Sequence, residues 1–373
     1  MSSLLPVRPS CPSILATKRV RTPVTESHTA CPWDAAGYYL CSYTDDTFWH
    51  LDRLDNQGQL YATKRYGYTS TGAGVRAYVV DFRVYGAHSE FGSRVEAGTN
   101  MMVDPDIADP VNPGSGEEPP VALDGAPANN PCGGWIADEN ARPGHGTGVA
   151  SVLAGNTVGV AKDATIVPVK VGNCAGDIPK LAVARGLDWI QADMQNQGGT
   201  LAVVIMSFAF GVAGQEGAQV CEDGMGGFTN CRAAVENEIN ALISQNIVVV
   251  TSANNQNVGN SCGAQTPARM GYGNETNFPN TYRTITVGGT MYTGSYVDQR
   301  WTCAVQPGAC AASGSFAANN PGSNWGPCVS IFAPAWNINV AGAAGPTSFR
   351  WSTPDFDPSA LVNTRLPYMP ATE

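Results

Sequence analysis

The most regular feature of this chain is a series of short, continuous apolar runs separated by segments of helical character. The runs are VRAYVVD, TIVPVKV, LAVVIMSF and NIVVVTSA, and strands buried on both faces of a parallel sheet have this pattern. Helices are predicted over residues 178–195 and 231–245, and from His145 onward. Alternating strands and helices predict an α/β fold with a mainly parallel central sheet flanked by helices.

The segments outside this pattern are less regular. Residues 1 to about 45 mix Pro, Ser, Thr and charged residues without periodicity, which predicts a partly disordered N-terminal extension over residues 1–48. The remaining residues, 49–373, are predicted to form one domain. Inside that domain, a segment rich in Pro, Asp, Asn and Gly predicts a loop from Gly98 to Gly144.

Composition narrows the classes of function. A chain of 373 residues with 43% hydrophobic content can bury a large core, and a net charge of -10 disfavours nucleic-acid binding. Eleven cysteines favour disulfides and an extracellular or secretory compartment, although no clear signal peptide is present. The sequence contains no CxxC pair or Cys/His cluster that would indicate a zinc site. The longest apolar run, residues 201–212, is too short to span a membrane.

Three polar residues lie where this architecture exposes functional groups. Asp81 ends one predicted strand, His145 begins a helix, and Asn254 follows another strand. An acid, a base and an amide donor on separate elements can meet at one edge of a sheet.

Several motifs in the same order resemble the subtilisin family, and within it the proteinase K-like branch. They are WHLDRLD at residues 49–55, GAGVRAYVVD, the segment His88–Phe91, GHGTGVASVLAG, and SNWGPCVSIFAP at residues 323–334. The resemblance covers roughly residues 49–358 and implies a three-layer subtilisin-like fold, shortened at its C-terminal end.

The resemblance also implies chemical roles. Asp81 would accept a hydrogen bond from one imidazole nitrogen of His145, whose other nitrogen would take a proton from a serine hydroxyl. The side-chain amide of Asn254 would stabilise the oxyanion, a contribution of about 3 to 4 kcal/mol in such sites.

The position of the nucleophile departs from the family pattern. When residues 331–334 are aligned without a gap, residues 351–354 occupy the Ser-Gly-Thr-Ser motif, and Pro354 replaces the serine. Proline has no hydroxyl and no backbone donor, so it can neither attack a carbonyl nor serve the oxyanion. Ser348 is the fallback nucleophile if a loop is shifted, and the simpler interpretation of Ser348 and Ser352 is a loop hydroxyl.

The segments that would bind substrate are also altered. The family has Ser-Leu-Gly-Gly where this chain has Ser207, Phe208, Ala209 and Phe210, so the primary pocket is predicted to be narrowed or filled. Ser252 and Ala253 replace the usual Ala-Gly before the asparagine. Phe82 follows the aspartate. We hypothesise that Phe82, Phe208 and Phe210 form an apolar patch that docks a segment of a partner protein.

Two functions remain open. The first is a subtilisin-fold homologue that has lost peptidase activity and binds a polypeptide substrate or protein partner. The second is a secreted serine endopeptidase that uses Ser348 with Asp81 and His145, or a chain whose C-terminal part is altered by a sequence error or frameshift. No cofactor is expected. Calcium is common in the family, and the acidic segments 104–109 and 117–124 are candidates without an assignable ligand.

Overall fold

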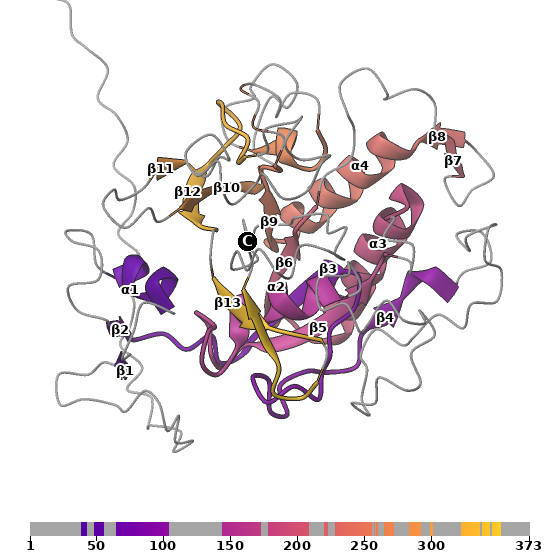
Figure 1. Ribbon diagram of the computed structural model, residues 1–373. Helices are drawn as coiled ribbons and strands as arrows, with labels where there is room; N and C mark the ends of the chain where they lie inside the picture. Colours follow the sequence, from indigo (N-terminus) through magenta and orange to yellow (C-terminus); the bar gives the residue numbers. More distant parts are fainter. Residues whose placement is uncertain are drawn as a thin grey trace, which may run out of the picture.

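The fold is built on one large sheet with helices on both faces (Figure 1). The computed structural model describes residues 39–42, 48–55, 65–103, 144–172, 178–208, 220–222, 228–255, 257, 259, 265–271, 283–291, 299–300, 322–335, 338–343 and 345–351.

The central sheet has eight strands among the described residues, in the order β11-β10-β9-β6-β3-β5-β4, and β12 pairs with β10. All of these pairings are parallel except that of β10 with β11. The strands are β3 (Val75–Asp81), β4 (Thr99–Asn100), β5 (Thr165–Lys170), β6 (Leu201–Met206), β9 (Val248–Ser252), β10 (Ile285–Met291), β11 (Gln299–Arg300) and β12 (Ile331–Pro334).

The structure confirms the elements predicted from the apolar runs. The four runs form β3, β5, β6 and β9, and the predicted helices are α2 (His145–Ala154), α3 (Lys180–Asn196) and α4 (Cys231–Ser244). The prediction of a loop from Gly98 was wrong at its start, because β4 and a 3₁₀ turn (Met101–Val103) continue the sheet edge there. A strand of two residues, such as β4, is too short to produce an apolar periodicity in the sequence.

Smaller elements surround the sheet. The short helix α1 (Trp49–Asp55) lies near an antiparallel pair formed by β1 (Tyr39–Ser42) and β2 (Arg65–Tyr68). A second pair is β7 (Val220–Glu222) with β8 (Phe228–Asn230), and a third is the hairpin of β13 (Asn339–Ala341) with β14 (Phe349–Trp351). The boundary at residue 48 stays a prediction, although β1 lies before it and pairs with β2.

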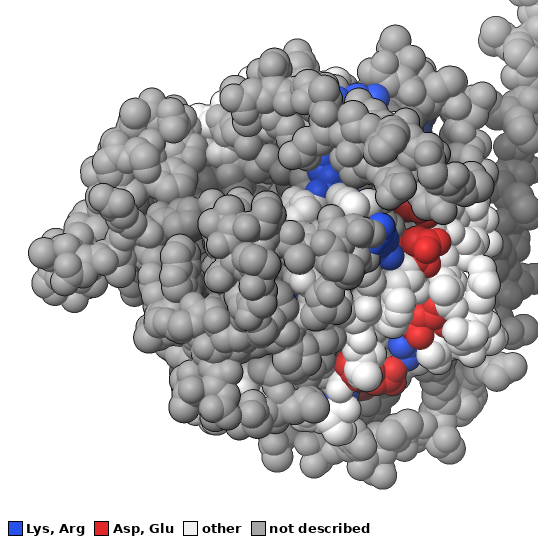
Figure 2. Space-filling view, turned by 90° about the vertical axis from the view of Figure 1, so that its right-hand side faces the viewer, with Lys and Arg blue, Asp and Glu red and all other residues white. Residues whose placement is uncertain are grey.

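The described surface carries charges of both signs. Figure 2 shows acidic and basic side chains interleaved on the described part of one face. Within the described residues, no helix is both long and apolar enough to cross a membrane.

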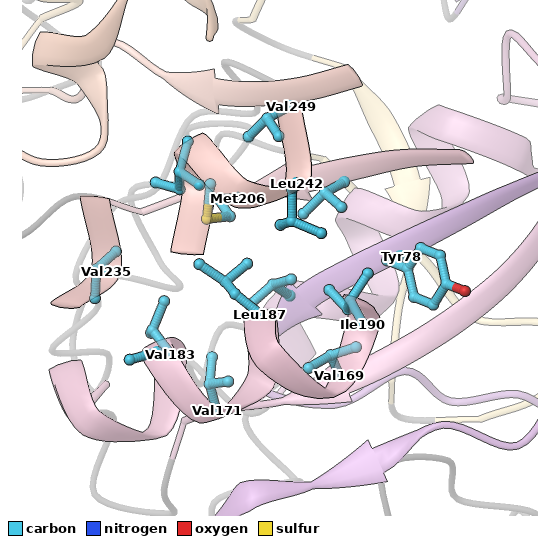
Figure 3. Close-up of a cluster of buried hydrophobic side chains, with 14 of the residues drawn as sticks. Tyr78, Val169, Val171, Val183, Leu187, Ile190, Met206, Val235, Leu242 and Val249 are labelled. Carbon is cyan, nitrogen blue, oxygen red and sulfur yellow. The ribbon is translucent and has the colours of Figure 1, made fainter. Parts of the chain in front are cut away.

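The sheet is covered on both faces, which gives three layers. On one face, α3 and α4 pack against β3, β5, β6 and β9 through the side chains shown in Figure 3. On the other face, α2 packs against β3, β5 and β6 through Val149, Ala150 and Ala154. Because these strands are buried on both sides, their apolar runs are continuous. The predicted α/β fold class is therefore confirmed.

Leu187→Ala should lower the free energy of unfolding by about 2 to 5 kcal/mol, because a buried leucine replaced by alanine leaves a cavity. Leu187 lies at the centre of the α3 face and is 0% exposed, whereas Leu201 at the start of β6 is 72% exposed. Leu201→Ala is the matched control and should change stability by less than about 0.5 kcal/mol. Urea denaturation of both variants measures the difference, and equal effects would contradict the described core.

Candidate active site

An acid–base pair lies at the carboxyl edge of the sheet. Asp81 is the last residue of β3, a central strand, and His145 is the first residue of α2. His145 Nδ1 lies 2.8 Å from Asp81 Oδ2 and 3.0 Å from Oδ1. Both are buried, with 2% of Asp81 and 8% of His145 exposed. A carboxylate that accepts the Nδ1 hydrogen favours the tautomer in which Nε2 carries the lone pair, as a general base requires.

The residues around this pair explain its geometry. A Cβ at Gly146 would lie 2.6 Å from the carbonyl oxygen of Arg83, so glycine is required for α2 to begin this close to β3. The Thr147 hydroxyl accepts a hydrogen bond from the backbone N–H of Tyr85 at 3.0 Å. The backbone N–H of Phe82 donates to Asp81 Oδ1 at 2.7 Å. The Gly-His-Gly-Thr motif therefore attaches the start of α2 to the segment after β3.

Phe82 does lie beside the pair, but it faces inward. Its ring is edge-on to the His145 ring at 6.4 Å and lies so close to Gly172 that a Cβ there would overlap it. Phe82 is buried, so the hypothetical apolar patch cannot include its ring. Phe208 is partly buried against the α3 core, and Phe210 lies outside the described residues.

Asn254 follows β9, two strands from β3, and so lies at the same edge of the sheet. Its φ of 74° is in the left-handed region, which asparagine tolerates better than most residues. Its backbone N–H donates to the Ser252 hydroxyl at 3.0 Å, and its Oδ1 accepts from the N–H of Asn255 at 2.8 Å. Ser252, which replaces the alanine usual in the family, thus supports the turn at Asn254.

Gln265 accepts a hydrogen bond from the Asn254 amide, and no pattern in the sequence indicates this contact. Its Oε1 accepts from Asn254 Nδ2 at 3.3 Å and from Asn324 Nδ2 at 3.1 Å, and only 4% of the residue is exposed. The next residue, Thr266, donates to Glu236 of α4 at 2.5 Å. This contact joins segments that are distant in sequence, and a lone glutamine before Thr-Pro indicates no more than a turn.

The predicted substrate-binding segment begins at Ser207, directly after β6. Because β6 lies between β3 and β9, Ser207 lies between the strands that end at Asp81 and Ser252. The Ser207 hydroxyl is buried and has no hydrogen-bond partner among the described residues, which is uncommon for a buried polar group. Ala253 is fully buried. Ala209 lies outside the described residues.

Buried polar groups fix the loop that follows α2. The Glu90 carboxylate accepts from the backbone N–H groups of Thr157 and Val158 at 2.9 and 3.1 Å. Lys162 Nζ donates to two carbonyls of the same loop at 2.8 and 3.0 Å, and burial lowers the pKa of this amine to about 8. His50 Nε2 donates to the Val158 carbonyl at 2.9 Å, and burial lowers the pKa of His50 to about 4. Both ends of α2 are therefore anchored.

Ser348 lies in the β13–β14 hairpin. Its hydroxyl accepts from the N–H of Gly345 at 3.1 Å and donates to the carbonyl of the same residue at 3.0 Å. Its own carbonyl accepts from His88 Nε2 at 2.7 Å. Ser352 and Pro354 lie outside the described residues.

Within the described ranges, no group of three His, Cys, Asp or Glu side chains could hold a metal ion. The acidic segments 104–109 and 117–124 lie outside those ranges, so a calcium site there stays untested.

A carboxylate–imidazole pair and a nearby asparagine at the carboxyl edge of a parallel α/β sheet define the class of subtilisin-like hydrolase folds. The model of the subtilase family, peptidase S8, matches residues 129–366. The chain belongs to the subtilase family.

Known relatives agree with this assignment. The extracellular serine proteinase of Thermus sp. (strain Rt41A) is 33% identical over 293 residues, which are 79% of this chain and 49% of that protein. The alkaline serine exoprotease A of Vibrio alginolyticus is 27% identical over 79% of this chain and 38% of its own length. The chain thus spans half or less of these relatives. A crystal structure of a cold adapted subtilisin-like serine proteinase matches with a TM-score of 0.51 and 26% identity, over 82% of this chain and 78% of that one.

Gln265→Ala should lower the free energy of unfolding by about 1 to 3 kcal/mol, because two amides that point toward Oε1 lose their acceptor in a buried site. Gln245→Ala is the matched control, since the Gln245 amide bonds to Gln191 in an exposed position. This control should cost less than about 0.5 kcal/mol. Thermal or urea unfolding measures both, and an equally small effect at Gln265 would contradict its role as the support of Asn254.

Proposed function

We propose that this chain is a subtilisin-fold peptidase homologue that binds polypeptides but forms no acyl-enzyme. The observation that carries the proposal is the contrast between two parts of the site. The pair of Asp81 and His145 keeps the geometry of a general base. The fallback nucleophile, Ser348, has its hydroxyl bonded within its own turn.

The sequence register supports the loss of the nucleophile. The alignment is anchored at residues 331–334, which form β12 and pair in parallel with β10. From that strand, an ungapped alignment with the family motif places Pro354 at the position of the attacking serine. A proline side chain offers no oxygen to attack a carbonyl and no backbone N–H for the oxyanion.

The alternative is a serine endopeptidase that uses Ser348. The names of the relatives favour it, because the proteins from Thermus and Vibrio are called a proteinase and an exoprotease. The geometry weighs against it, because Ser348 would have to give up both hydrogen bonds to Gly345 and leave its contact with His88. Each such bond contributes about 0.5 to 1.5 kcal/mol.

Polypeptide is the proposed ligand class. The adjacent ends of β6 and β9 provide the amide-bearing turn at Asn254 and a buried hydroxyl at Ser207 that has no partner in the described part of the chain. Polar groups beside strand ends suit an extended backbone with its alternating donors and acceptors. The net charge of -10 weighs against nucleic acid as the ligand.

An extracellular or secretory location is proposed on two grounds. Cys41 and Cys328 are both disulfide-bonded, and disulfides persist mainly in oxidising compartments. The Thermus relative is named an extracellular proteinase.

Purified protein should not be labelled by a serine-reactive fluorophosphonate, because the ungapped register puts Pro354, which has no hydroxyl, at the position of the nucleophile. Ser348→Ala and His145→Ala should therefore give the same background signal as the wild type, measured by intact mass. Labelling of the wild type that is lost in both variants would establish the alternative. Fluorescence anisotropy with labelled, unfolded casein tests the binding half, and no saturable binding by a folded sample would contradict it.

A further inference from the structure

His88 lies in the segment after β3 and contacts the hairpin formed by β13 and β14. The residue is 1% exposed. Its Nε2 lies 2.7 Å from the carbonyl oxygen of Ser348, and its Nδ1 lies 3.1 Å from the backbone nitrogen of Glu90. A carbonyl can only accept and a backbone N–H can only donate. The imidazole must therefore be neutral, with its hydrogen on Nε2 and a lone pair on Nδ1.

Two further hydrogen bonds hold the same hairpin against the rest of the fold. The N–H of Ser89 donates to the carbonyl of Pro346 at 2.7 Å. The N–H of Ala341 donates to the Ser151 hydroxyl of α2 at 2.9 Å. These two bonds do not involve a group that titrates near neutral pH, whereas the bond from His88 does.

The surroundings of His88 disfavour its charged form. The rings of Tyr85, Phe91 and Phe349 lie 5.5 to 6.3 Å from the imidazole, and Phe349 belongs to the hairpin itself. Burial lowers the pKa of His88 from 6.5, and the bond to Ser348 and the charge of Glu90 oppose this effect.

The Glu90 carboxylate is the charged group that acts on His88, and it is already engaged. It accepts from the N–H groups of Thr157 and Val158, and its charge acts on Lys162, as does that of Arg94. On the α2 side, the group that contacts the hairpin is the Ser151 hydroxyl, which accepts from Ala341 and is neutral. The carboxylate is therefore committed to the loop after α2.

We propose that His88 is a proton-sensitive latch that holds the β13–β14 hairpin in place. Protonation puts a hydrogen on Nδ1, which then faces the N–H of Glu90 instead of accepting from it. Two donors cannot share that contact, so the ring of the cation must turn away from the Glu90 N–H, and this turn removes Nε2 from the Ser348 carbonyl. Release of the hairpin, which carries Phe349, also exposes the charged ring to water. This device requires no hydrolysis and goes beyond the proposed function.

The direction of the pH effect follows from linkage. The pKa of His88 is lowered in the docked state and returns toward 6.5 when the hairpin is released. Docking is therefore fully stabilised above pH 6.5 and is weakened as the pH falls below it toward the pKa of the docked state. Within that window the equilibrium constant for release should rise about tenfold per pH unit.

Hydrogen exchange of the hairpin amides tests the latch. Gly342 and Ser348 donate hydrogen bonds within the hairpin, and their exchange is compared with that of β3 and β6 amides between pH 7.5 and 5. After division by the intrinsic rate at each pH, protection of the hairpin should fall below pH 6.5, by at most about tenfold per unit, while the strands stay protected. The matched control is His88→Gln, whose amide can still donate to Ser348 but does not titrate.

The control separates His88 from every other titrating group, including His50. In His88→Gln, hairpin protection should not depend on pH. An equal pH dependence in both proteins would overturn the latch. If the variant fails to fold, the nitrogen chemical shifts of His88 in the wild type report its protonation state and tautomer and so test the latch. A neutral ring with hydrogen on Nε2 at pH 7.5 is expected, and a cation or the opposite tautomer at that pH would overturn the proposal.

Discussion

The close approach of α2 to the end of β3 is the constraint on which the site depends. It is set by Gly146, whose missing side chain allows the helix to begin against the Arg83 carbonyl, and by the buried pairing of Asp81 with His145. Parallel pairing of β3 with β5 and β6 places the aspartate at the carboxyl edge. The loop after α2 is in turn fixed by Glu90 and Lys162. A displacement at either end of the helix would move the imidazole.

Most of the fold could be predicted from the sequence because the central strands are buried on both faces. Continuous apolar runs then identify β3, β5, β6 and β9 directly, and Asp81 and His145 are found at the ends of such elements. The missed features have no local pattern. Gln265 meets Asn254 and Asn324 through contacts between separate loops, and His88 meets Ser348 across 260 positions of sequence. The edge strand β4 is too short to have a periodicity.

The site combines a buried acid–base pair with unusual surroundings. Asp81 orients the His145 ring through Nδ1, while the inward-facing Phe82 ring fills space beside it and the hydroxyl of Ser348 is bonded within its turn. The β13–β14 hairpin is attached through His88 and Ser89 to the same segment that follows Asp81. The segment after Asp81 thus contacts both the start of α2 and the β13–β14 hairpin.

The most direct test is a downfield proton NMR spectrum recorded with and without a peptide boronic acid. A hydrogen-bonded Nδ1 proton of His145 is expected, which disappears in Asp81→Asn and is unchanged by the boronic acid, because the proposed proline at the nucleophile position has no oxygen to form a tetrahedral adduct. A shift of this proton that requires the boronic acid group, and that the same peptide without boron does not produce, would contradict the account.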